Sequence, residues 1–187
     1  MAYTESRMLD LGTRAPYFEL LDTRTNEIVS LTELKSEVAT VIMFLCNHCP
    51  YVVHINPEIV RLAREYQEQG VAFIAISSND VEAYPQDGPD KMKEVAEDLG
   101  YPFPYLYDET QEVARDYDAA CTPDFYLFDG DLRLVYRGRL DDARPGTGKP
   151  LTGRDLRAAL DAVLAGEPVN PQQYPSGGCN IKWKQHP

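Results

Sequence analysis

The sequence predicts an α/β fold with a central mixed sheet flanked by helices, an N-terminal extension and an extended C-terminal tail. Apolar runs at residues 38–45 and 71–76 enclose a segment with apolar residues at three- and four-residue spacing. This strand–helix–strand order is typical of a parallel pair. Apolar runs at 125–128 and 132–136 flank an Asp-Gly turn, which predicts an antiparallel hairpin. A sheet that contains both kinds of pair is mixed.

The helix between the first two strands is expected to begin at Pro50 and to stop at Gly70, because proline suits a first turn and glycine a C-terminal stop. The other elements are shorter. We expect helices at 91–99, 109–117 and 153–164 and a strand at 105–107.

After Glu167 the composition changes to prolines and a Gly-Gly pair. We therefore expect one domain over residues 1–166 and a tail over 167–187. The tail contains Ile181 and Trp183, apolar residues that favour packing of the tail on the same domain.

The charge excludes some classes of partner. The chain of 187 residues has a formal net charge of −12, which argues against binding to nucleic acid or to an anionic membrane surface.

The first residues have no basic and apolar secretory pattern, and no apolar run is long enough to span a membrane. Four cysteines are too few for a disulfide scaffold, so we expect a cytoplasmic, reducing location.

The most informative stretch is residues 46–50, Cys-Asn-His-Cys-Pro, where a buried strand passes into a helix. A helix N-terminus offers unpaired N–H groups and partial positive charge, which favour a thiolate. We expect Cys46 to be the exposed attacking thiol and Cys49 the shielded resolving thiol. His48 between them would add positive charge near the Cys46 thiolate and make the pair more oxidising.

A metal site is the main competing interpretation of this pair. Cys46 and Cys49, with His48 or Cys121, could ligate a soft metal, but structural zinc usually needs a second close Cys or His pair. Cys121 and Cys179 are isolated in the sequence. We therefore assign no metal and no cofactor.

Four stretches carry a family resemblance: residues 12–20, 44–51, 122–129 and 178–184. They combine Cys-x-x-Cys with a later Thr-Pro, and the chain resembles the thioredoxin superfamily. It is more similar to the redoxin branch of TlpA-like and peroxiredoxin-like proteins than to small thioredoxins. The resemblance covers the chain from about residue 10 to its end and implies a thioredoxin-like fold.

The resemblance also implies that the Thr122–Pro123 bond is cis and faces the two thiols, with the Thr122 backbone free to pair with an extended substrate. Cys121 lies two residues before Pro123, and is either a small buried residue or a third thiol. Cys179 follows two glycines, and either a structural or a resolving role is open to it.

The chain departs from the family at two places. Small thioredoxins carry a buried carboxylate six residues before the first cysteine, where this chain has Thr40. Peroxiredoxins carry Pro-x-x-x-Thr/Ser-x-x-Cys, but Met43 and Ala39 occupy the corresponding positions before Cys46. The main hypothesis is therefore a thiol–disulfide oxidoreductase that exchanges a Cys46–Cys49 disulfide with protein or small-thiol partners and an unidentified reductase or oxidant. A peroxiredoxin-like peroxidase and a metal-binding or metallochaperone module are the alternatives.

Overall fold

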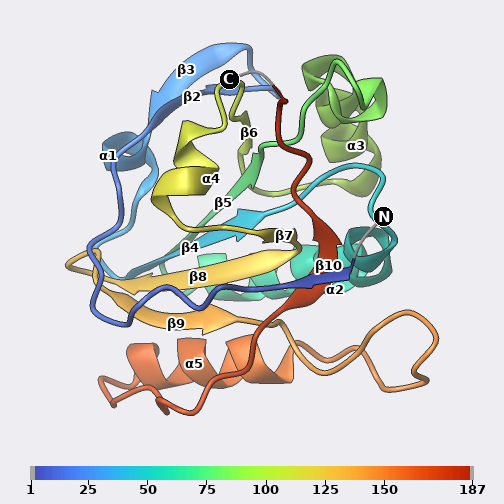
Figure 1. Cartoon of the computed structure of the whole chain (residues 1–187). Helices are drawn as coiled ribbons and strands as arrows, with labels where there is room; N and C mark the ends of the chain where they lie inside the picture. The colour runs from blue at the N-terminus through green and yellow to red at the C-terminus, as the bar shows by residue number, and fades with distance from the viewer. Residues whose placement is uncertain (1–2, 186–187) are drawn as a thin grey trace.

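A seven-stranded mixed sheet forms the centre of the structure, a computed structural model that describes residues 3–185 (Figure 1). Its strand order is β3-β2-β6-β5-β4-β8-β9. The pairs β4–β5 and β5–β6 are parallel and the other pairs antiparallel, which confirms the predicted mixed sheet. The strands are β2 (Glu19–Asp22), β3 (Glu27–Ser30), β4 (Ala39–Phe44), β5 (Val71–Ser77), β6 (Tyr105–Tyr107), β8 (Asp124–Asp129) and β9 (Leu134–Gly138).

Helices cover both faces of this sheet (Figure 1). They are α1 (Leu31–Leu34), α2 (Pro50–Gln67), α3 (Pro89–Leu99), α4 (Glu112–Asp116) and α5 (Arg154–Leu164), and a 3₁₀ turn, η1, spans Pro85–Asp87. The predicted start at Pro50 is confirmed, and α3 begins two residues before its predicted start. Among the described residues, no helix combines the length and the apolar character needed to cross a membrane.

The central strand β4 explains why the motif lies at the heart of the fold. Val41 and Met43 pack into the core that includes α2 and α5, whereas Ile42 and Phe44 pack into the core that includes α1 and α4. All six residues of β4 are buried, because helices cover both faces, and this produces the continuous apolar run in the sequence. The Cys46–Cys49 segment therefore follows a strand held rigidly on both sides.

The C-terminal tail contributes a strand to a second, three-stranded sheet. In this sheet, β10 (Gly177–Asn180) lies between β1 (Tyr3–Glu5) and β7 (Cys121–Thr122), antiparallel to both (Figure 1). A Cβ atom at Gly178 would lie 2.1 Å from the Thr122 carbonyl oxygen, so only glycine permits this close approach. The tail thus reaches the carboxyl end of β4, where the cysteine pair lies.

Candidate active site

Cys46 and Cys49 lie between the end of β4 and the start of α2. Cys49 is the N-cap of α2, one residue before Pro50. Both thiols are buried: Cys46 is 2% exposed and Cys49 is fully buried. Cys49 is shielded as predicted, but the expectation of an exposed Cys46 is wrong. The Cys46 side chain packs into the main core cluster, and its Sγ lies 3.5 Å from Thr122 Oγ1.

The two thiols share one proton. The neighbouring Cys46 thiol lowers the pKa of Cys49 to about 5, and Cys179 acts in the same direction. Contact with Cys49, burial and the nearby Asp87 carboxylate raise the pKa of Cys46 well above its ordinary value. These directions favour the thiolate on Cys49 in the reduced pair, whereas the sequence favoured Cys46. The reason is that Cys49 receives donors while Cys46 faces a carboxylate.

His48 forms an ion-pair contact that the sequence does not indicate. Its Nδ1 lies 2.7 Å from Oδ2 of Asp87, which is completely buried, and its ring stacks on Tyr84. Asp87 also accepts hydrogen bonds from the Asn47 backbone N–H at 2.9 Å and from the Asn79 amide at 2.9 Å. The charge of a protonated His48 is thus offset by a buried carboxylate, which weakens its predicted effect on the Cys46 thiolate.

Asp87 and Asn79 were not predicted as site residues because both lie in the connection between β5 and α3, Asn79 near its start and Asp87 at the end of η1. A polar loop residue gives no sign of burial in the sequence. Asp124 did offer a signal, because it is an acidic residue at the start of an apolar strand. Burial raises the pKa of Asp124 to about 7.

One group of side chains in the described residues has the donors for a metal: Cys46, His48 and Asp87, whose ligand atoms lie within 4.8 Å of one another. Zinc accepts thiolate, imidazole and carboxylate ligands. The Asp87 oxygens already accept N–H donors, and one of them is in contact with His48, so a metal would have to displace these partners. The set therefore fits an ion poorly in this arrangement.

The Thr122–Pro123 peptide bond is cis, and Thr122 faces the thiols. Its hydroxyl is beside Cys46, and its carbonyl oxygen lies 3.5 Å from the Cys49 sulfur. The Thr122 backbone, however, is not free for a substrate, because it already pairs with Cys179 of β10. The expectation of an open edge is wrong in this conformation, since the tail strand occupies that edge.

The structure separates the two remaining cysteines. Cys121 is completely buried, and its thiol contacts the carbonyl oxygens of Pro123 and Ser176 at 3.8 and 3.9 Å. Cys179 is 3% exposed, and its sulfur lies only 2.6 Å from the Cys49 sulfur. Of the two possible additional thiols, the structure brings Cys179 directly to the pair.

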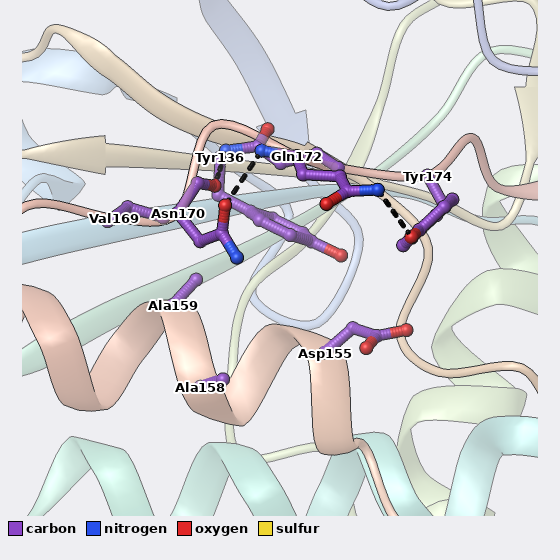
Figure 2. Close-up of a pocket in the computed structure, with 9 residues that line it drawn as sticks. Tyr136, Asp155, Ala158, Ala159, Val169, Asn170, Gln172 and Tyr174 are labelled. Atoms are coloured by element: carbon purple, nitrogen blue, oxygen red, sulfur yellow. Dashed lines mark hydrogen bonds between the residues drawn. The ribbon is translucent and has the colours of Figure 1, made fainter.

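A pocket elsewhere on the surface is independent of these thiols. It lies between α5 and the tail, with Tyr136, Asp155 and Gln172 among its lining residues (Figure 2). A hydrogen bond joins Gln172 to Tyr174 across its rim. No cysteine lines it, so the thiol site and this pocket are distinct.

The chain is similar to a known family and to solved structures. Residues 11–137 match the AhpC/TSA family. The crystal structure of an uncharacterized conserved protein from Geobacillus kaustophilus has 60% identity and a TM-score of 0.98, over 100% of this chain and 99% of that one. A hypothetical protein from Sinorhizobium meliloti has 48% identity and a TM-score of 0.95, over 97% of this chain and 99% of that one.

A more distant structure shares the fold. The thioredoxin domain of a thiol-disulfide oxidoreductase from Bacteroides vulgatus has 18% identity and a TM-score of 0.58, over 73% of this chain and 90% of that one. No curated protein matches the chain. The thioredoxin-like fold expected from the sequence is confirmed.

Proposed function

The chain belongs to the AhpC/TSA family, whose membership supports redox chemistry at its thiols, and we propose that it is a thiol–disulfide oxidoreductase. The Cys46–Cys49 pair would exchange its disulfide with protein or small-thiol partners. The observation that carries the proposal is the placement of both sulfurs of the Cys-x-x-Cys motif against Thr122, with Cys46 Sγ 3.5 Å from its hydroxyl and Cys49 Sγ 3.5 Å from its carbonyl oxygen. A thiolate is the reactive species in disulfide exchange.

The reaction begins at Cys46, which lies ahead of α2, whereas Cys49 is the N-cap of that helix. Its proton passes to Cys49 along their hydrogen bond, so Cys49 takes the role of the proton acceptor that is missing at Thr40. The Cys46 thiolate attacks one sulfur of the substrate disulfide, and the other sulfur leaves as a thiolate and takes the proton from Cys49. The Cys49 thiolate then attacks Cys46, which forms the Cys46–Cys49 disulfide and releases the second substrate sulfur as a thiolate, which takes a proton from solvent. Two electrons pass to the substrate.

The occupied edge at Thr122 favours small disulfides over extended protein chains. A polypeptide could pair with the Thr122 backbone only after β10 leaves it. The reductase or oxidant that restores the pair is unidentified, and the cytoplasmic location stays a prediction from the sequence.

The test compares reduction of insulin and of a small disulfide by wild type and by Cys46→Ser and Cys49→Ser. We expect Cys46→Ser to slow turnover strongly, because only Cys49 and Cys179 are left to react, and Cys49→Ser to accumulate a mixed disulfide on Cys46. Cys121→Ser changes a buried thiol that lies 3.8 and 3.9 Å from the carbonyl oxygens of Pro123 and Ser176; it is the matched control and should keep turnover. Wild-type turnover by Cys46→Ser would contradict the proposal.

A thiol peroxidase is the second candidate, and the AhpC/TSA match favours it. The Thr122 hydroxyl, 3.5 Å from the Cys46 sulfur, could hold a peroxide oxygen, although Met43 and Ala39 replace the family pattern. Consumption of hydrogen peroxide with a thiol reductant measures this activity. Peroxide turnover faster than disulfide exchange would make the peroxidase the better assignment.

A further inference from the structure

We propose that Cys179 is a third redox thiol, which takes Cys49 from the Cys46–Cys49 disulfide and forms an alternative Cys49–Cys179 disulfide. The inference rests on the proposed oxidoreductase function, which supplies the first disulfide. It deepens that function by assigning the tail a direct part in thiol exchange.

The placement of the sulfurs carries the inference. The Cys49 and Cys179 sulfurs are 2.6 Å apart, about half an ångström longer than the roughly 2.05 Å bond of a disulfide. Cys46 lies three residues before Cys49, and both of their sulfurs lie 3.5 Å from atoms of Thr122. Cys49 can therefore bond to either partner with little movement of the chain.

The contacts of the tail hold Cys179 in this position. Cys179 pairs with Thr122 in the sheet, and Gly178 lets the two backbones approach closely. Beyond the strand, the Ile181 N–H bonds the Ala120 carbonyl at 3.0 Å, and the Lys182 N–H bonds the buried Asn79 side chain at 2.9 Å. The thiol is thus fixed from both sides along the chain, and a chance approach of a mobile tail does not account for the contact.

The exchange step is balanced without another reagent. The Cys179 thiolate attacks Cys49 Sγ, the Cys49–Cys179 bond forms, and the Cys46–Cys49 bond breaks. The electron pair goes to Cys46 Sγ, and Cys46 takes up the proton that Cys179 has lost. No net oxidation occurs, because one disulfide replaces another, and Cys46 is free again.

The electrostatics of the site favour this step after oxidation. In the reduced protein, burial and the neighbouring Cys49 thiolate raise the pKa of Cys179 to about 12, while Lys182 opposes the shift. Formation of the Cys46–Cys49 disulfide removes the negative charge on Cys49. The pKa of Cys179 then falls, and its nucleophilic thiolate becomes more accessible.

The test maps the disulfides of the full-length protein after oxidation with one equivalent of a small disulfide. Free thiols are trapped with an alkylating reagent after an acid quench, and the linked peptides are identified by mass spectrometry. We expect both Cys46–Cys49 and Cys49–Cys179 linkages, with Cys121 fully alkylated. The wild-type measurement requires no substitution, so it does not depend on whether a variant folds.

Three variants separate the inference from the proposed function. Cys46→Ser should still form the Cys49–Cys179 disulfide, and the further change Cys179→Ser should abolish it, whereas Cys121→Ser should leave the wild-type pattern unchanged. A Cys46–Cys49 disulfide with Cys179 fully alkylated in wild type would overturn the third-thiol inference alone. The absence of any intramolecular disulfide would overturn the oxidoreductase proposal as well.

Discussion

The proton shared by Cys46 and Cys49 determines how the reduction potential of the pair changes with pH. The pKa of Cys49 is lowered to about 5, and that of Cys46 is raised well above its ordinary value. Throughout the neutral range the reduced pair therefore carries one proton. A two-electron couple changes by about 30 mV per pH unit for each proton that it takes up. An ordinary dithiol, with both pKa values near about 8.5, takes up two protons and changes by about 59 mV per unit.

The measurement is the equilibrium with glutathione redox buffers between about pH 6 and pH 8, in the Cys179→Ser variant so that only the Cys46–Cys49 disulfide forms. Serine keeps a hydroxyl donor beside Cys49. We expect the potential to fall by about 60 mV across this range, against about 120 mV for an ordinary pair. The slope should steepen below about pH 5, where Cys49 also binds a proton.

A slope of about 59 mV per unit through the whole range would refute the reasoning, because it would mean that both thiols are protonated at neutral pH. The same pKa shift affects the stability of the reduced protein. Because folding lowers the pKa of Cys49, its thiolate stabilises the folded protein at pH values above the pKa of this thiol in the unfolded chain. This stability is lost as the pH falls through about 5. Unfolding of the reduced form at decreasing pH provides an independent check of this direction.

Three further predictions concern residues around the thiols. Burial raises the pKa of Asp124 to about 7, so the protonated carboxyl favours folding and the wild type loses stability as the pH rises through about 7. Asp124→Asn should remove up to about 4 kcal/mol of this loss. An unchanged pH profile of urea unfolding in the variant would contradict this prediction. Gly178→Val should force β10 away from the Thr122 carbonyl and lower the free energy of unfolding by about 1–3 kcal/mol. A wild-type melting temperature with an intact Cys49–Cys179 disulfide would show that the strand tolerates a side chain at this position. His48→Ala should leave Asp87 without its imidazole partner and make the Cys46–Cys49 couple more reducing by about 30 mV. This shift in potential should be smaller in an Asp87→Asn background. An equal shift in both backgrounds would argue against action through Asp87.

The sequence predicts those parts of the fold that depend on local pattern. The β4–α2–β5 unit and the β8–β9 hairpin have long apolar runs and clear turn residues, and their predicted pairing directions are confirmed. The β2–β3 hairpin was not predicted, because its short strands lie at the sheet edge with mixed exposure; Ile28, for example, is 64% exposed. Such strands show no clean alternation of apolar and polar residues.

The candidate site, like the fold, is predictable from the sequence only where it depends on a local motif. The positions of Cys46 and Cys49 follow from a local motif, but their ionisation does not, because it depends on Asp87 and Cys179, which are distant in sequence. Residues 177–180 read Gly-Gly-Cys-Asn, which has little intrinsic preference for a strand. They form β10 because Gly178 allows close approach to Thr122 of β7 and Gly177 to Tyr3 of β1, a tertiary effect that sequence pattern cannot reveal.

The position of β10 makes two states of the site mutually exclusive. An extended substrate that pairs with the Thr122 backbone must displace β10 and with it Cys179, so Cys49 then has only Cys46 as its partner. When β10 is seated, Cys179 contacts Cys49 and the edge is closed to an extended chain. A Cys49–Cys179 disulfide would bond the strand covalently in the closed position. Substrate pairing at Thr122 and exchange with Cys179 would therefore occur one after the other, and the tail would act as both a competing strand and a competing thiol at the same place.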